Sequence, residues 1–309
     1  MKKRLFAILP AVCLLLSGCG RPTEAPTDTT LSVVATTYPI YLFTTAVTHG
    51  VADVEVSLLV NQETSCLHDY TLTVPDMKLL EQADVIVQNG VGLEDFLTDA
   101  LTTSTAALID CSRGVSLLPA HGHEGHDHET EYDPHIWMDP SRAAQMVTNI
   151  SVGLSLSDPD NTAAYEENAA AAVAALTGEA SFLKKLSAGD APLCRELITF
   201  HDGFSYFADA LDLHLLHAME EEEGSEASAA EIREILALIE EHDVPAIFTE
   251  VNGSNATAAA IARESGVTVG QLSMVMSGDG SGLDPYCAAL RENGETVIRL
   301  LRGKQASEP

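Results

Sequence analysis

Short apolar runs alternate with amphipathic stretches along the first half of the chain. Short apolar runs, of which the first is β-branched, predict strands at 31–36, 54–60, 84–88 and 106–110. Helical spacing of apolar residues predicts helices at 38–47, 74–82 and 93–102. Strands that alternate with helices need crossover connections, and such connections build a parallel sheet. The pattern therefore predicts an N-terminal α/β lobe, which we place at residues 31–157.

The second half has the same organisation without repeating the sequence. Apolar runs predict strands at 196–200, 214–219, 246–250 and 267–274, and amphipathic stretches predict helices at 204–211, 227–242, 256–264 and 285–302. In one of these helices, Ile232, Ile235 and Ile239 fall on the same face. We therefore expect a C-terminal α/β lobe at 188–305. The predicted fold is two lobes, each a roughly four-stranded parallel sheet flanked by helices.

A long helical connector separates the two halves. A first helix is predicted at 140–156, after Asp139 and Pro140. The stretch 161–186 is rich in Ala, Glu and Leu, so it predicts a single helix of about 39 Å at 1.5 Å per residue. We assign 158–187 as a rigid linker helix, which favours small rearrangements of the lobes over wide hinge closure.

The N-terminus has the features of an export signal. A basic start precedes an apolar stretch at 5–16 that is too short to span a bilayer, so we predict a signal peptide at 1–18. The ending Leu-Ser-Gly-Cys resembles the lipobox of bacterial lipoproteins, which implies lipid attachment at Cys19. The alternative is an ordinary secretory signal. Residues 19–30 have the Pro/Thr composition of a tether. We expect an extracytoplasmic domain anchored to the cell membrane by lipid.

Charge narrows the range of partners. The 309 residues include 16 Lys and Arg against 46 Asp and Glu, a formal net charge of −30. Such a chain repels phosphate backbones and anionic lipid surfaces, so we expect no nucleic-acid partner and no membrane contact beyond the lipid anchor. The hydrophobic fraction of 46% argues against disorder. We expect a monomer, and the charge leaves cations as ligands.

Three of the eleven histidines follow predicted strands. His68 follows the second strand, His135 lies beyond the fourth, and His201 ends the first strand of the second lobe. Ligands of open α/β sheets bind beyond the carboxyl ends of the strands. Three neutral imidazoles in a cleft between lobes would suit zinc better than magnesium or calcium. The alternative is that each is a surface or hydrogen-bonded histidine.

A separate histidine cluster lies at 121–131. Its imidazoles alternate with Gly, Asp and Glu, which predicts a mobile loop able to gather metal weakly; the alternative is a solvated polar loop. The imidazoles of this auxiliary loop are His121, His123, His126 and His128. Four cysteines remain after Cys19, and they allow two disulfides in three connectivities, or none. They are Cys66, Cys111, Cys194 and Cys287.

Several blocks of sequence resemble one protein family. They include LSVVATTYPIY, HDYTLTVPDMKLLEQADVIVQNG, DPHIWMDP, ITFHDGFSYFADALDL and EASAAEIREILALIEEHDVPAIFTE. Together with the lipobox, these resemble the zinc/manganese-binding proteins of bacterial ABC transporters, in the same order over nearly the whole mature chain. The resemblance implies two lobes joined by a rigid helix, one bound Zn²⁺ (less readily Mn²⁺) and an ABC permease as partner.

The resemblance also implies that the three strand-end histidines are the metal ligands. The family commonly adds an Asp near the end of the last strand, where this chain has Ser273. Serine is a poor zinc ligand, so a water, Glu250, a Glu from 220–223 or, less readily, Cys66 would complete the site. We therefore hold Glu250 and Ser273 as candidates for the fourth ligand or its support.

These features predict metal capture and delivery rather than catalysis. The histidine loop would raise the local metal concentration, the cleft would bind one ion, and a permease would receive it. A zinc-dependent hydrolase is the alternative, because three imidazoles and a water resemble a catalytic zinc centre. The sequence contains no HExxH or GxSxG motif, so we predict no enzyme activity. A metal-binding surface adhesin or metal store is the third hypothesis.

Overall fold

Two parallel β-sheets form the framework of the molecule. The structure is a computed structural model that describes residues 30–61, 67, 70–120, 132–189, 191–219 and 228–303. The first sheet contains β1 (Leu31–Thr37), β2 (Val54–Val60), β3 (Val85–Gln88) and β4 (Ala107–Asp110). The second contains β5 (Glu196–Thr199), β6 (His214–Ala218), β7 (Ala246–Glu250) and β8 (Thr268–Leu272). Both have four strands, which confirms the predicted fold class.

The two sheets share one topology. Their strand orders are β2-β1-β3-β4 and β6-β5-β7-β8, and the strands pair in parallel in both sheets. The order reverses beside the first strand of each sheet, where open α/β folds bind ligands beyond the carboxyl ends of the strands. This topology places the segments after β1 and β3, and those after β5 and β7, at the edges where a site is expected.

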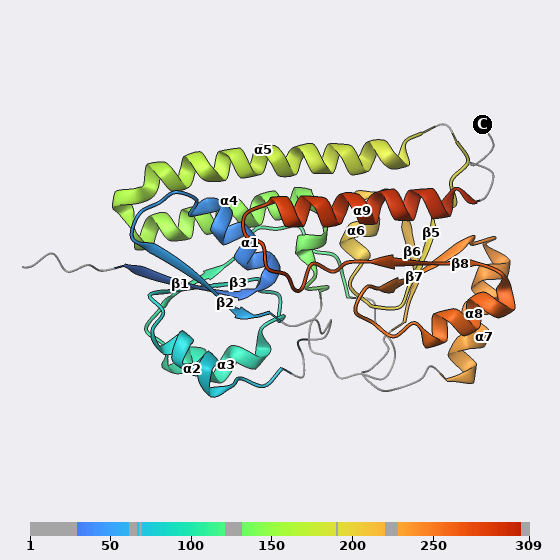
Figure 1. Ribbon diagram of the computed structural model, residues 1–309, viewed down its shortest axis with the longest axis horizontal. Coiled ribbons are helices and arrows are strands. Elements are labelled where there is room, and N and C mark those ends of the chain that lie inside the picture. The colour runs from blue at the N-terminus through green and yellow to red at the C-terminus, as the bar shows by residue number, and fades with distance from the viewer. Residues whose placement is uncertain are drawn as a thin grey trace, which may run out of the picture.

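Helices cover both faces of the sheets. In Figure 1, α5 runs along one side of both lobes above α4 and α9, while α2 and α3 lie on the opposite side of the first lobe and α7 and α8 on that of the second. The helices of the first lobe and the connector are α1 (Tyr38–Val47), α2 (Val74–Glu81), α3 (Thr98–Thr103), α4 (Pro140–Ser157) and α5 (Thr162–Ser187). Those of the second lobe are α6 (Ser205–Ala210), α7 (Ala229–Glu241), α8 (Ala256–Ser265) and α9 (Asp284–Leu301).

Two of these helices begin at capping boxes. The Thr73 hydroxyl accepts the amide of Asp76 at the start of α2, and the Asp76 carboxylate accepts the Thr73 amide. Ser228 and Glu231 make the same reciprocal pair at the start of α7. Each box satisfies amide groups that a helix start leaves without partners, which explains why the helices begin where they do.

Side chains of alternate strand residues enter two hydrophobic cores. Phe248 on β7 enters a large core that runs through both lobes, whereas its neighbour Ile247 enters a smaller core beneath α7 and α8. The same alternation separates Leu197 from Ile198 on β5, because successive side chains of a strand point to opposite faces. The large core also contains residues of β1, β3, α4 and α9, so the lobes share one apolar interior.

Hydrogen bonds reinforce the contact between the lobes. The indole of Trp137, in the short 3-10 helix Ile136–Met138, donates to the Met274 carbonyl at 2.9 Å. The hydroxyl of Tyr286 on α9 donates to the Trp137 carbonyl at 2.6 Å, and its ring packs edge to face on Phe43, 5.0 Å between centroids. These side chains are buried, so separating the lobes would expose both the rings and the bonds.

The connector helix α5 is also fixed to the second lobe. Glu179 on α5 is buried and forms a two-point ion pair with Arg291 on α9, with N–O distances of 2.7 and 2.5 Å. The guanidinium lies 4.8 Å from the ring centre of Phe182. The predicted single long helix is confirmed, with 26 residues in α5.

Some predicted features lie outside the described residues. None of the helices in the described part of the chain is long and apolar enough to cross a membrane. Cys111, Cys194 and Cys287 are free thiols there, which leaves no disulfide among these three. The features outside are the signal peptide 1–18, Cys19 and most of the tether, Cys66, His68, the loop 121–131 and residues 220–223.

Candidate metal centre

Two of the predicted ligands meet between the lobes. His135 immediately precedes the Ile136–Met138 turn, and His201 lies two residues beyond β5. Their ring centroids are 5.6 Å apart and the rings are nearly perpendicular, at 85°. Each imidazole belongs to a different half of the chain, so the folded molecule brings these two residues together as the sequence predicts.

The third predicted ligand, His68, lies outside the described residues. Within the described ranges, no group of three or more His, Cys, Asp and Glu side chains is arranged to hold a metal ion. Two imidazoles alone are an incomplete set for zinc, which takes four ligands. The described residues therefore supply two imidazoles of the predicted set of three.

Asp133 orients the His135 ring. Its carboxylate oxygen lies 2.8 Å from His135 Nδ1 and also accepts the His135 amide at 2.8 Å. This contact selects the tautomer in which Nδ1 carries the proton, so that Nε2 presents its lone pair to a metal. Asp133 is absent from the predicted site residues, although its place two residues before the histidine in Asp-Pro-His is a usable signal.

Burial and charge act in opposite directions on the His135 pKa. Burial lowers it, but the negative charge and hydrogen bond of Asp133, with smaller effects from Asp202 and Glu250, outweigh burial and raise the pKa above its ordinary value. Burial raises the pKa of Asp133, whereas the charge and hydrogen bonds of His135 lower it, and the net shift is downward. The pair is thus polarised, which makes the imidazole a more basic ligand.

Glu250 lies beside the second imidazole. It ends β7, is 4% exposed, and its Oε2 is 3.9 Å from His201 Nδ1. That distance is longer than a hydrogen bond. The Glu250 carboxylate faces Nδ1 of His201, just as the Asp133 carboxylate faces Nδ1 of His135. This position suits orientation of His201 better than direct metal ligation.

Ser273 has a local structural role. It lies just beyond β8, where its hydroxyl accepts the Val275 amide at 3.1 Å. Its backbone exchanges two hydrogen bonds with the Asn293 side chain, at 2.9 and 2.8 Å. The predicted strand at 267–274 ends earlier, at Leu272, because the Ser273 backbone bonds to the Asn293 side chain instead of to a neighbouring strand. This geometry does not favour Ser273 as a ligand.

Gly203 permits the close approach of the rings. A Cβ atom at this position would lie 2.9 Å from His201 Cδ2, 3.0 Å from His135 Cδ2 and 2.5 Å from Met274 Cε. Such distances are too short for carbon atoms in contact, so a larger residue would require the neighbours to move. The absence of a side chain leaves both imidazoles packed against the backbone.

A buried polar network supports the His135 loop from the first sheet. The Asn89 side chain, just after β3, donates to the Pro134 carbonyl at 2.9 Å. Glu94 accepts the Asn89 and Gly90 amides and the Thr36 hydroxyl, at 2.7, 3.0 and 2.7 Å. Burial raises the pKa of Glu94, those three hydrogen bonds lower it, and the net pKa is about 7.

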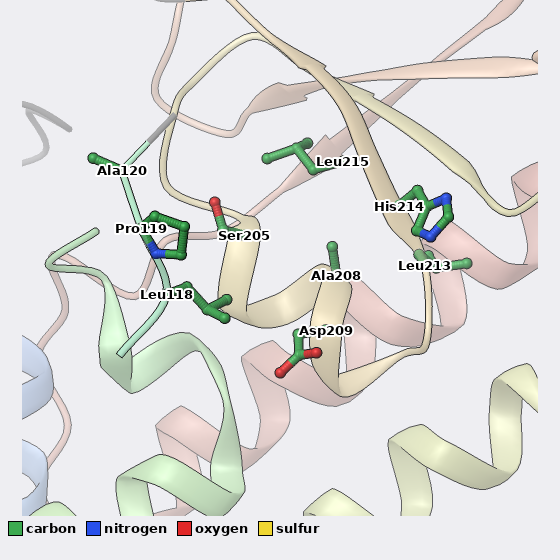
Figure 2. Close-up of a pocket in the computed structure, with 9 residues that line it drawn as sticks. All are labelled: Leu118, Pro119, Ala120, Ser205, Ala208, Asp209, Leu213, His214 and Leu215. Atoms are coloured by element: carbon green, nitrogen blue, oxygen red, sulfur yellow. The ribbon is translucent and has the colours of Figure 1, made fainter. Parts of the chain in front are cut away.

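A cavity of about 340 Å³ lies apart from the imidazoles. Figure 2 shows that its walls come from 118–120, from α6 and from 213–215. Most of these side chains are aliphatic, and the polar ones are Ser205, Asp209 and His214. Neither His135 nor His201 lines it, so this cavity is separate from the candidate metal centre.

Comparisons with known proteins place this arrangement in a family. A family model described as "Zinc-uptake complex component A periplasmic" (ZnuA) matches residues 33–299. The chain is 29% identical over 279 residues to the zinc-binding lipoprotein AdcA of Streptococcus pneumoniae, covering 86% of this chain and 54% of that protein. It therefore spans about half the length of that relative.

Two further matches cover more of the compared chain. The high-affinity zinc uptake system protein ZnuA of Bacillus subtilis is 29% identical over 278 residues, with 84% of each chain covered. The solved structure of FpvC from Pseudomonas aeruginosa in complex with Mn²⁺ has a TM-score of 0.78 and 26% identity, covering 88% of this chain and 99% of that one. Because the family model covers most of its length, the chain belongs to the ZnuA family of periplasmic zinc-uptake components.

Proposed function

We propose that the protein is the extracytoplasmic metal-binding component of an ABC importer. It captures Zn²⁺ between its lobes and delivers the ion to a permease in the cytoplasmic membrane. The observation that carries this proposal is the meeting of His135 and His201 across the lobes, each with a buried carboxylate beside Nδ1. The names of the relatives, a zinc-binding lipoprotein and a zinc uptake protein, agree with this function.

The proposed ligands are His68, His135 and His201, with zinc as transported substrate. Nitrogen ligands favour zinc over manganese, which prefers more oxygen. The Mn²⁺ complex of FpvC supports Mn²⁺ as a second substrate of the same centre. Asp133 and Glu250 orient the imidazoles, and a water completes the coordination unless Glu250 turns toward the ion.

The remaining assignments follow from the sequence. Residues 1–18 are the signal peptide, Cys19 carries the lipid, and the lobes are 31–157 and 188–305 with the linker 158–187 between them. The histidines of 121–131 act as an auxiliary, weaker collector of metal. The mature protein is a monomer held outside the cytoplasmic membrane, and it has no enzymatic role.

Zinc competition titrations of the mature protein test the proposal. The wild type is expected to bind one ion tightly, and His135→Ala to lose that site. His242→Ala, at the exposed C-cap of α7, is the control and is expected to bind like the wild type. Deleting 121–131 should remove only weak binding. Several equivalent weak sites that survive His135→Ala would instead indicate a metal store, and zinc-dependent ester hydrolysis lost in that variant would favour the hydrolase.

A further inference from the structure

A single buried hydroxyl joins the second lobe to the support of His135. Tyr206 lies on α6, five positions after His201, and is fully buried. Its hydroxyl donates to the Asp133 carbonyl at 2.8 Å and accepts the Leu118 amide at 3.0 Å. The hydroxyl thus donates one hydrogen bond and accepts another, both with backbone groups of the first half of the chain.

These two backbone groups lie opposite each other. The Asp133 amide donates to the Leu118 carbonyl at 3.0 Å, and Pro119 and Tyr132 form an antiparallel bridge beside them. We call these four residues the neck. Figure 2 shows Leu118 and Pro119 of the neck next to the α6 residues that line the cavity. The hydroxyl therefore contacts both strands of the neck at once.

The ring that carries the hydroxyl is itself fixed. The Arg142 guanidinium lies 4.8 Å from the Tyr206 ring centre, donates to Asp209 at 2.8 Å and donates to the Ser116 carbonyl at 2.8 Å. Burial raises the Tyr206 pKa, the Leu118 amide and Arg142 lower it, Asp133 raises it, and the net value is about 12. The hydroxyl therefore keeps its proton and donates over the whole physiological range.

We propose that Tyr206 is a positioning residue for the metal centre, whose hydroxyl fixes the Asp133–His135 pair relative to His201. This inference rests on the proposed role of the two imidazoles as ligands. Asp133 uses its carbonyl for Tyr206 and its carboxylate for His135, so a shift of this backbone moves the imidazole directly. Tyr206 and His201 belong to the second lobe, whereas Asp133 and His135 belong to the first. The Tyr206 hydroxyl therefore sets the distance between the two imidazoles.

The conservative variant Tyr206→Phe tests this role in the full mature protein, with zinc alone as probe. The variant keeps the ring and its contact with Arg142 but loses both hydrogen bonds. Groups that orient metal ligands typically contribute ten- to a hundredfold in affinity, so the zinc dissociation constant should rise about tenfold or more. Tyr165→Phe is the matched control, because this buried hydroxyl donates to Asp158, away from the imidazoles. It should bind zinc like the wild type.

A double-mutant cycle separates positioning from general loss of stability. If Tyr206 acts through Asp133, then Tyr206→Phe should weaken zinc binding much less in an Asp133→Asn background than in the wild type. The visible absorption of bound Co²⁺ should also change in Tyr206→Phe and not in Tyr165→Phe. Wild-type affinity in Tyr206→Phe, or losses that add fully with Asp133→Asn, would overturn the inference. If the wild type has no tight zinc site, or has one that survives His135→Ala, the proposed function itself is overturned.

Discussion

At the scale of single residues, charge and hydrogen bonding determine the state of His135, one of the ligands we propose. The Asp133 carboxylate holds Nδ1 at 2.8 Å and raises the pKa of the ring against the effect of burial. A raised pKa also means that protons compete with the metal for the ring. The same carboxylate that makes the imidazole a better ligand therefore makes binding more sensitive to acid.

We expect zinc affinity to fall as the pH decreases, with the fall beginning above 6.5, the ordinary pKa of histidine. In Asp133→Asn the fall should move to lower pH, because the charge that raises the pKa is removed, while affinity at high pH drops about ten- to a hundredfold. Competition titrations between pH 5 and 8 measure both effects. Asp158→Asn, at the C-cap of α4 and away from the imidazoles, is the control. Identical pH profiles for Asp133→Asn and wild type would contradict this.

Glu94 gives a second pH effect, on stability rather than binding. Its folded pKa of about 7 lies above the ordinary 4.5, so the folded state holds the extra proton and stability is lost as pH rises from about 4.5 to 7. Glu94→Gln removes this dependence. The stability of the variant relative to wild type should therefore increase across that window by up to about 3 kcal/mol and stay constant above it. Urea unfolding of metal-free protein at pH 5 and 7.5 provides the measurement, and a constant difference would refute the assignment.

At the scale of elements, the Glu179–Arg291 pair fixes the connector α5 to α9. Removing only Arg291 leaves a buried carboxylate without its guanidinium, which is costly, whereas replacing both partners by apolar residues avoids that penalty. We expect Arg291→Met to lower the Tm of the metal-free protein and the double variant Glu179→Leu/Arg291→Met to recover much of it. Circular dichroism melting curves check this order. A double variant less stable than the single one would show that the pair itself stabilises the joint.

Most elements were predictable because most strands are short apolar runs and the longer helices have a periodic apolar face, whereas α3 buries no side chain. The predicted end of the last strand was wrong because the Ser273 backbone bonds to the side chain of Asn293, 20 positions away, a contact that no local pattern reveals. The proximity of His135 and His201 was predictable from their places after strands, while their role as metal ligands stays a prediction. The positioning role we propose for Tyr206 was not, because its contacts with Leu118 and Asp133 join residues 88 and 73 positions apart.

At the scale of the whole molecule, the lobes share one apolar interior and several hydrogen bonds between them. Opening a cleft between such lobes would expose Trp137 and Tyr286, both fully buried. We therefore expect the radius of gyration from X-ray scattering to be the same with and without zinc. A clear contraction on binding would show that the lobes hinge despite their common core.

The shared interior has a consequence for the timing of metal release. If the lobes do not separate, the ion leaves only when its bonds to the imidazoles are replaced one after another by other ligands. The residence time of the metal would then be set by ligand exchange, and a receiving protein that offers its own donor groups would shorten it far more than thermal motion of the lobes could.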